Sequence, residues 1–162
     1  MKGEPSELIP LVVVVGPTAV GKTSLGIAIG ERFDGEIISA DSRQFYRMMD
    51  IGTATPTPEE RTRVRHHLIN IADPNETVGL AQFLELARAA IRDVHQRGKL
   101  PIVVGGTGQY VRGLLRGWRV PNVPPDPELR AELESQSPDA LWKRLMTLDP
   151  DAAARIPDLD PW

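Results

Sequence analysis

An eight-residue loop near the N-terminus constrains the fold of this chain more than any other feature of its sequence. Residues 16–23 read Gly-Pro-Thr-Ala-Val-Gly-Lys-Thr, a glycine, four residues, a second glycine, a lysine and a threonine. The backbone N–H groups of such a loop converge on an anion, and the lysine and a helix N-terminus strengthen the positive field. An apolar run, Leu11–Val15, precedes the loop. The loop therefore predicts a phosphate or diphosphate site between a buried strand and a helix.

The predicted anion site comprises every residue of this loop: Gly16, Pro17, Thr18, Ala19, Val20, Gly21, Lys22 and Thr23. We expect Lys22 to neutralise non-bridging phosphate oxygens and the Thr23 hydroxyl to hold a Mg²⁺ ion that bridges them. ATP and small diphosphates both fit this description. Motors and switches that hydrolyse nucleoside triphosphates normally also have an apolar strand ending in a metal-binding Asp. Residues 101–104 form such a run but end in glycines, which weakens the hydrolase interpretation.

Apolar runs alternate with helical patterns along the first 117 residues. We expect strands at 11–15, 36–40, 67–71 and 101–104, and helices at 22–33, 58–64, 77–97 and from about 108. In the first helix we expect Leu25, Ile29 and Phe33 to share the buried stripe, and Thr77 is the candidate cap of the third helix. The alternation predicts an α/β fold, a P-loop NTPase-like parallel sheet flanked by helices.

The amino-acid composition changes in the last quarter of the chain, which is rich in proline. Eight of the 15 prolines lie from Pro121 onward. We therefore expect a P-loop α/β core over residues 1–120, followed over 121–162 by a Pro-rich linker and a shorter helical part. Helices are expected there at 127–133 and 138–148.

Charge and composition limit the classes of partner. A net charge of −3 argues against indiscriminate nucleic-acid binding, although clustered arginines leave a local basic face open as an alternative to solvated helix faces. The absence of cysteine agrees with a reducing compartment. No segment approaches the roughly 18 apolar residues needed to span a membrane. We expect a cytoplasmic monomer with no membrane association.

Three loops are expected to meet at the carboxyl ends of the strands, where ligands bind in such sheets. They are the phosphate loop, residues 41–44 and residues 105–108. Asp41 is placed to take a proton from an attacking hydroxyl or amine, although an Asp there also commonly caps a turn. Thr107 would offer a hydroxyl to the same ligand. Ser42, Arg43 and Gln44 are less certain on chemistry alone.

Some other candidates have more ordinary interpretations. The adjacent side chains of His66 and His67 point apart in extended backbone, so joint metal binding is not expected. Tyr46 and Trp118 could stack on a base, but such residues more often serve packing.

The motifs taken together resemble those of the tRNA dimethylallyltransferases (tRNA isopentenyltransferases). The matching segments follow one another in order: GPTAVGKT at 16–23, DSRQFYRMMDIGTATP at 41–56, HHLINIADP at 66–74, GGTGQY at 105–110 and DPELR at 126–130. The resemblance implies transfer of a dimethylallyl group from dimethylallyl diphosphate to N6 of an adenosine beside the tRNA anticodon. It also implies that the P-loop holds the diphosphate and Mg²⁺.

By motif position, Asp41 would be the general base and Thr107 would contact the reacting region. The same resemblance implies contacts to the tRNA anticodon stem-loop from Asp41, Ser42, Arg43, Gln44, Thr107 and Arg130. It further implies that the C-terminal part begins a helical tRNA-binding insertion, of which this chain would carry only a piece. We therefore expect a C-terminally truncated member of that family.

Other functions remain open from the sequence. A P-loop small-molecule kinase could use Asp41 to activate a hydroxyl, but it would not explain the blocks at 41–56 and 66–74. An enzyme that prenylates free adenine nucleotides is a nearer alternative, and the segment at 126–130 favours tRNA over it. An inactive fragment that binds phosphate without turnover is the third.

Overall fold

The computed structural model describes residues 8–120 and 123–156 of the chain. These residues belong to two compact units, divided after residue 122. The assignment of residues 121–162 to a linker and an incomplete insertion stays a prediction.

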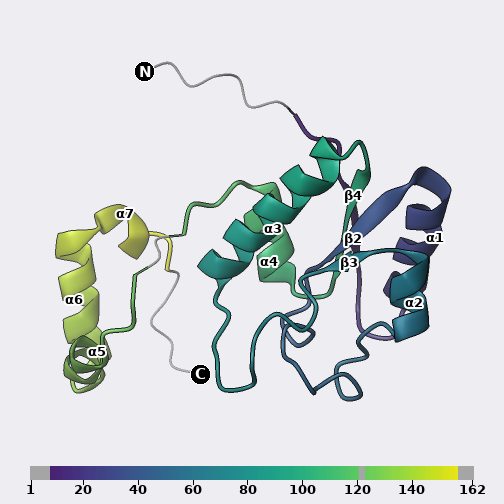
Figure 1. The fold of residues 1–162 in the computed structure, drawn as a ribbon. Helices are drawn as coiled ribbons and strands as arrows, with labels where there is room; N and C mark the ends of the chain where they lie inside the picture. The colour runs from purple at the N-terminus through teal and green to yellow at the C-terminus, as the bar shows by residue number, and fades with distance from the viewer. Residues whose placement is uncertain (1–7, 121–122, 157–162) are drawn as a thin grey trace. The chain divides into compact units, whose positions relative to one another are not determined.

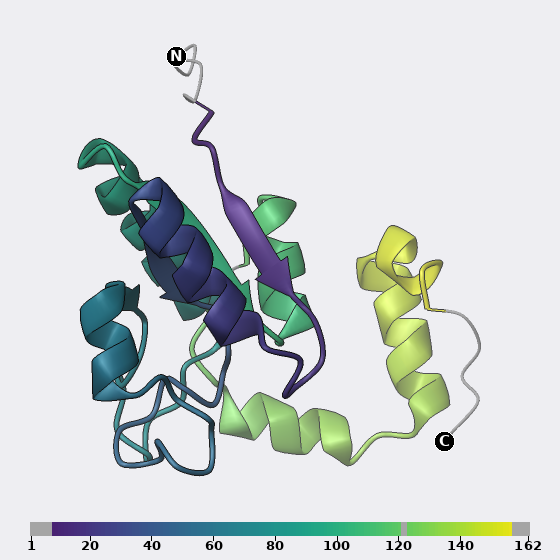
Figure 2. The same ribbon diagram turned by 90° about the vertical axis from the view of Figure 1, so that its right-hand side faces the viewer.

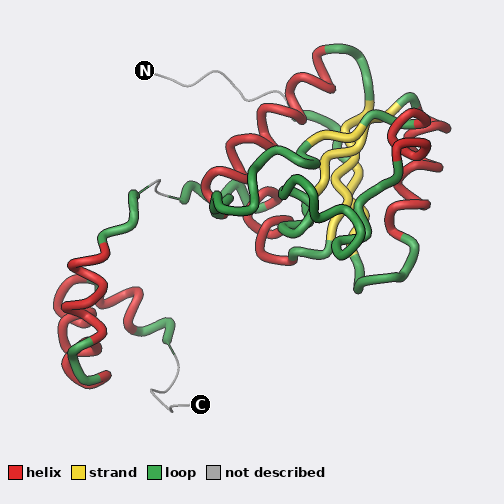
Figure 3. Tube along the Cα trace, turned by 60° about the horizontal axis from the view of Figure 1, so that its bottom comes forward, coloured by secondary structure: helices red, strands yellow, loops and turns green. Residues whose placement is uncertain are grey.

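The first unit is built on a four-stranded, all-parallel sheet with strand order β1-β4-β2-β3 (Figures 1 and 3). The strands are β1 (Val12–Val15), β2 (Gly35–Ser39), β3 (His66–His67) and β4 (Leu100–Gly105). Helices flank the sheet, which confirms the predicted α/β class. β4 is the last strand along the chain, but in the sheet it lies between β1 and β2.

Two layers of helices cover the sheet. α1 (Lys22–Phe33) and α2 (Pro58–Arg63) lie on one face, and α3 (Leu80–Gln96) and α4 (Gly108–Leu115) lie on the other (Figures 1 and 2). Because successive side chains of a strand point to opposite faces, Ile37 packs with the first layer and Ile38 with the second. In the second layer the rings of Phe45, Phe83 and Tyr110 stack on one another.

The predicted stripe of α1 was wrong for two of its three residues, since only Ile29 packs against the core. Leu25 and Phe33 are exposed, and the residues that α1 buries are Gly26, Ile27 and Gly30. A Cβ at Gly26 would lie 2.8 Å from Val104 Cγ2, so the helix is seated on the sheet through its glycines. Apolar periodicity overlooks such a face because glycine carries no apolar side chain.

Two element boundaries also differ from the prediction. α3 begins at Leu80 with Gly79 as its N-cap residue, so Thr77 does not cap it. The strand expected at 67–71 is the two-residue β3, because the backbone turns left-handed at Leu68 (φ 61°) and Asn70 (φ 54°). An L-residue in that conformation cannot continue an extended strand.

Over residues 123–156, the second unit contains three helices, α5 (Pro127–Glu134), α6 (Pro138–Leu148) and α7 (Pro150–Ala153). Each begins with proline at its first turn, and the side chain before it accepts an N–H of that turn. These capping residues are Asp126, Ser137 and Asp149. The sequence analysis predicted α5 and α6 but missed the four-residue α7.

No helix of the described residues is long and apolar enough to cross a membrane.

Candidate functional site

The strand order brings the three predicted loops together. β4 pairs with β1 on one side and with β2 on the other, so the ends of all three strands are neighbours. Gly105 makes the closest approach: a Cβ there would lie 2.3 Å from the carbonyl oxygen of Ala40. Since only glycine allows this contact, the loop after β4 is brought against the loop that carries Asp41.

The phosphate loop has the backbone that an anion cradle requires. Ala19 (φ 64°) and Gly21 (φ 87°) are left-handed, and Gly21 is the N-cap residue of α1. The Lys22 ammonium donates to the carbonyl of Pro17 at 2.6 Å, which folds its side chain back across the loop. The loop thus presents a helix N-terminus and a cation at one place.

Asp41 begins a turn in which one of its two carboxylate oxygens accepts a hydrogen bond and the other is left for a ligand. Its Oδ1 accepts the N–H of Arg43 at 3.0 Å, and its carbonyl accepts the N–H of Gln44 at 3.2 Å. No residue in the described ranges is recorded as bonding to Oδ2. The turn-cap and functional interpretations therefore both fit Asp41, because the cap engages one carboxylate oxygen.

Thr107 is tied directly to the Asp41 loop. Its Oγ1 accepts the N–H of Ser42 at 3.2 Å and donates towards the Ser42 hydroxyl at 3.5 Å. Its own N–H donates to the carbonyl of Ala40 at 3.3 Å. The bonds to Ser42 join residues 65 positions apart, and together with the bond to Ala40 they hold Thr107 beside Asp41.

The other two predicted residues of the Asp41 loop differ in orientation. Gln44 is turned inward: its Oε1 accepts from the Ser39 hydroxyl at 2.8 Å, and its Nε2 donates to Ala54 O at 3.3 Å. Arg43 is exposed. Arg130 lies in the second unit, where its guanidinium is 3.7 Å from Glu134 on the same helix.

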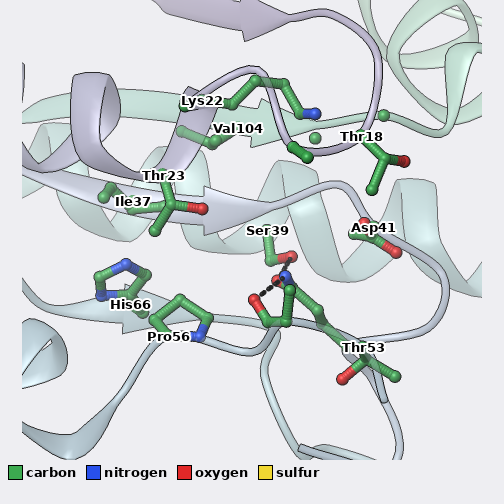
Figure 4. Close-up of a pocket in the computed structure, with 16 residues that line it drawn as sticks. Thr18, Lys22, Thr23, Ile37, Ser39, Asp41, Thr53, Pro56, His66 and Val104 are labelled. Atoms are coloured by element: carbon green, nitrogen blue, oxygen red, sulfur yellow. Dashed lines mark hydrogen bonds between the residues drawn. The ribbon is translucent and has the colours of Figure 1, made fainter. Parts of the chain in front are cut away.

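These loops line a pocket of about 320 Å³. Figure 4 shows Thr18 and Asp41 towards one end of it and Pro56 and His66 towards the other. Lys22 and Thr23 lie along its wall with the end of β4. Several lining residues lie outside the loops predicted from the sequence: Ile37, Ser39, Thr53, Ala54, Pro56, His66 and Val104.

His66 is the lining residue with the clearest polar signal. Its Nδ1 lies 2.7 Å from the carbonyl of Val64, so Nδ1 carries the proton and Nε2 is left as an acceptor. That Nε2 is buried and has no partner among the described residues. Burial lowers the pKa of His66 and favours this neutral form. No periodicity or motif argument points to this atom, because its environment comes from residues on several elements.

The second histidine of the pair belongs to a separate cluster. His67 Nε2 lies 2.7 Å from Glu36 Oε2, and Arg97 makes a two-pronged contact with the same carboxylate. The Arg97 hydrogen bonds, with a smaller contribution from His67, lower the pKa of Glu36 to about 2. The cluster joins β2, β3 and the end of α3, and it lies at the start of β2 rather than at the pocket.

The two aromatic candidates pack against the main core. Trp118 and Tyr46 are both partly buried there. The backbone carbonyl oxygen of Trp118 also accepts a hydrogen bond from the Arg88 guanidinium at 2.7 Å. Tyr46, in contrast, also lines a surface hollow beside the site.

The oxygen atoms around the pocket suit a magnesium ion that is held partly by the protein and partly by the phosphates of a bound molecule. Residues 8–120 and 123–156 contain no group of three or more His, Cys, Asp or Glu side chains that could hold a metal. Mg²⁺ needs no such group, since it binds one or two protein oxygens together with phosphates and water. The Thr23 hydroxyl and the Asp41 carboxylate, in one pocket with the phosphate loop, fit that pattern.

Several known proteins are similar to the chain in sequence. A tRNA dimethylallyltransferase of Roseiflexus sp. is 56% identical over 154 residues, which cover 93% of this chain and 50% of that protein. A tRNA dimethylallyltransferase of Chloroflexus aurantiacus is 56% identical over 151 residues, covering 91% and 51%. The chain therefore spans about half the length of the curated relatives it matches.

Solved structures extend the likeness to the fold. A full-length tRNA isopentenylpyrophosphate transferase from Bacillus halodurans matches with a TM-score of 0.69 and 46% identity over 93% of this chain and 51% of that one. A eukaryotic dimethylallyltransferase, described as acting on tRNA, matches with a TM-score of 0.78 and 36% identity over 93% and 39%. The family described as IPP transferase matches residues 44–161. The chain belongs to the IPP transferase family.

Proposed function

We propose that this chain is the catalytic part of a tRNA dimethylallyltransferase. The reaction transfers a dimethylallyl group from dimethylallyl diphosphate to N6 of an adenosine next to the tRNA anticodon. The observation that carries the proposal is that the phosphate loop and Asp41 line one pocket, and that Asp41 and Thr107 line the cavity beside it, in a member of the IPP transferase family. A cytoplasmic location and a monomeric state stay predictions.

The transfer requires that the diphosphate leaving group is bound and that a proton is removed from the adenine N6. The adenine amine is a weak nucleophile because its lone pair is delocalised into the ring. The allylic carbon offsets this weakness, since loss of diphosphate leaves a resonance-stabilised cation. As the N6–C1 bond forms, the C1–O bond breaks, and the bonding electrons leave with the diphosphate.

The residues of the pocket match these needs. Lys22 and the N–H groups at the start of α1 would stabilise the charge that develops on the diphosphate. Asp41 Oδ2 would accept the N6 proton, while the bond from Arg43 N–H holds the carboxylate in place. Thr107, fixed by Ser42, would orient the reacting groups.

Magnesium would be held by the Thr23 hydroxyl together with the diphosphate itself. When bound, the ion supplies positive charge to the leaving diphosphate oxygens. The adenosine must leave its stack to reach such a pocket, as in other enzymes that act on a base. The roles of Asp41, Ser42, Arg43, Gln44, Thr107 and Arg130 towards tRNA are part of this proposal.

Replacing Asp41 by Asn tests the proposal directly. Asn keeps the oxygen that accepts Arg43 N–H but cannot take a proton at neutral pH. We expect transfer from labelled dimethylallyl diphosphate to an anticodon stem-loop RNA to fall by about 10²–10⁴-fold, with diphosphate binding nearly unchanged. Asp93→Asn, on α3 and remote from the pocket, is the control and should leave transfer intact.

The same assay separates the alternatives. Near-normal transfer by Asp41→Asn would exclude Asp41 as the base. Phosphorylation of a small molecule, with tight competition by ATP and none by dimethylallyl diphosphate, would favour a kinase. Prenylation of free adenine nucleotides in preference to RNA would favour the nucleotide-modifying relative. Binding of diphosphate by the unaltered chain with no transfer to any acceptor would favour an inactive fragment.

A further inference from the structure

Two groups of three arginines lie close together in the sequence, and the structure pairs one of them with carboxylates. In this first group, on and just after α2, each guanidinium lies 4.0 Å or less from a carboxylate oxygen. Its positive charge is therefore largely compensated inside the molecule. The pairs are Arg61 with Asp50, Arg63 with Glu31, and Arg65 with Glu36.

The second group, Arg112, Arg116 and Arg119, is exposed. Within residues 8–120 and 123–156, no carboxylate pairs with any of these three guanidiniums. The local sequence gives the reason, since no Asp or Glu occurs between Asp93 and Asp126 in a chain whose net charge is −3. A positive face on a chain of negative net charge is a candidate contact for an anionic partner.

Helix packing adds a fourth arginine to this face. Gly113 lets α4 approach α3, since a Cβ there would lie 3.4 Å from a leucine methyl of α3, and the two helices lie side by side (Figure 1). The Arg88 guanidinium reaches from α3 to the carbonyl oxygen of Trp118, 2.7 Å away. Arg88 and Arg119 line one surface hollow of about 240 Å³, in which Glu85 is the acidic lining residue. We call the four residues Arg88, Arg112, Arg116 and Arg119 the arginine face.

The arginine face begins next to the candidate site. Thr107, which lines a cavity with Asp41, is the N-cap residue of α4. At a rise of about 1.5 Å per residue, Arg112 lies about 7 Å and Arg116 about 13 Å along the helix from Thr107. Because Arg112 and Arg116 are four residues apart, both lie on the same side of α4. The face is therefore placed for a part of the acceptor molecule that stays outside the pocket.

We propose that the arginine face binds the phosphates of a paired RNA stem that adjoins the acceptor adenosine. This inference rests on the proposed function, since it takes the acceptor to be an RNA adenosine. Guanidinium groups match phosphate oxygens in both geometry and charge. Arginines one helical turn apart offer these donors in a row.

The composition of the face favours a duplex over an unpaired strand. Unpaired nucleotides bind largely by stacking on aromatic rings. The aromatic side chain beside these arginines is Trp118, which packs on Gly113: a Cβ there would lie 3.2 Å from Trp118 Cε3. The groups left for a partner are guanidiniums, which contact the nucleic-acid backbone without reading the sequence. The predicted contact is therefore electrostatic and independent of the stem sequence.

The salt dependence of RNA binding tests this inference. Binding is measured by fluorescence anisotropy over a range of NaCl concentrations, with an anticodon stem-loop RNA and with its loop as a single strand. Each duplex phosphate that a cation neutralises adds about 0.9 to the slope of log Kd against log salt concentration. We therefore expect the slope for the stem-loop to fall by about 2–3 in the triple variant Arg112→Gln, Arg116→Gln, Arg119→Gln. The slope for the single strand should not change.

Matched variants control for the loss of charge and for folding. Arg116→Gln alone should lower the stem-loop slope by about one, whereas Arg63→Gln removes a charge that Glu31 already compensates and should leave it unchanged. Lysine at positions 112, 116 and 119 keeps the charge and should restore most of the slope. In the triple Gln variant we expect a higher KM for RNA, with kcat, diphosphate binding and urea unfolding unchanged.

Three outcomes would overturn the inference. An unchanged stem-loop slope in the triple Gln variant would assign the face to another anionic partner, such as an acidic protein, and leave the proposed reaction standing. An equal loss of slope with the single strand would show that the arginines contact the loop instead of the stem. Binding of diphosphate without any binding of RNA by the unaltered chain would overturn both the inference and the proposed function.

Discussion

Lys22 shows how much one residue of the phosphate loop depends on its local backbone. Its ammonium donates to Pro17 O at 2.6 Å, and Gly106 lies close enough that a Cβ there would be 3.9 Å from Lys22 Nζ. The cation is thus held between the loops after β1 and β4. Its hydrogen-bond partner among the described residues is a carbonyl dipole, so a diphosphate oxygen would be a stronger partner.

Replacing Lys22 by Met should weaken diphosphate binding with little effect on folding. A hydrogen bond to a charged group contributes about 1.5–3 kcal/mol, so we expect a rise in Kd of at least about tenfold. Isothermal titration with dimethylallyl diphosphate and with inorganic pyrophosphate measures it. Lys143→Met, in the second unit, is the matched control. An unchanged Kd for Lys22→Met would mean that the backbone cradle binds the anion without the lysine.

At the scale of elements, glycine decides how α1 packs. Gly30 faces Val64, the residue that ends α2, and a Cβ at Gly30 would lie 2.8 and 3.0 Å from the two methyl carbons of Val64. Gly26 meets Val104 in the same way, one turn earlier. The helix therefore approaches the layer beneath it more closely than any side chain at these positions would allow.

Gly30→Ala tests this close approach. Helix propensity alone would stabilise the variant by about 1 kcal/mol, whereas overpacking costs about 1–3 kcal/mol. Because Val64 is buried and its methyls cannot rotate away freely, we expect net destabilisation in urea unfolding. The double variant Gly30→Ala with Val64→Ala should lose less than the sum of the two single changes. Strict additivity would show that the two sites do not touch.

At the scale of the whole molecule, one buried carboxylate links the sheet to the second helical layer. The Glu36 side chain on β2 is 5% exposed. Its carboxylate contacts Arg97, at the end of α3, and His67 on β3. Arg65 lies 4.0 Å away, and Asp93 shares the Arg97 guanidinium. The network thus joins three elements at the edge of the sheet opposite the pocket.

The network should make stability depend on acid pH. The folded pKa of Glu36 is about 2, below the ordinary value of 4.5. Glu36 therefore stabilises the fold above about pH 5, and this contribution is lost as the pH falls through 4.5 towards 2. We expect Glu36→Gln to lower the free energy of unfolding by about 2 kcal/mol at pH 7 and by much less near pH 3.

Urea unfolding at pH 7, 5 and 3 measures this difference. Glu85→Gln, an exposed carboxylate on α3, is the control and should not change the pH profile. A Glu36→Gln variant whose profile runs parallel to that of the unaltered chain would contradict the assignment.

Local features of the chain were predictable from the sequence because their causes are contiguous. The phosphate loop is eight consecutive residues whose glycines, lysine and threonine specify their own backbone. α6 was predicted with its exact bounds, since Ser137 and Pro138 mark its start and apolar spacing runs through it. The alternation of strands and helices likewise predicted the parallel sheet. Asp41 and Thr107 were predicted as neighbours from the rule that strand ends share an edge.

Only the tertiary structure decided how these pieces meet. The insertion of β4 between β1 and β2 brings Thr107 to Ser42 across 65 residues, and the glycines of α1 decide which face it buries. The orphaned Nε2 of His66 and the Glu36 network also arise from residues far apart in the chain. Residue types and their spacing encode local backbone geometry, whereas distances between remote side chains depend on packing. The sequence by itself therefore determined the class of fold and the local backbone of the phosphate loop, where an anion site stays a prediction, and packing determined what surrounds that loop.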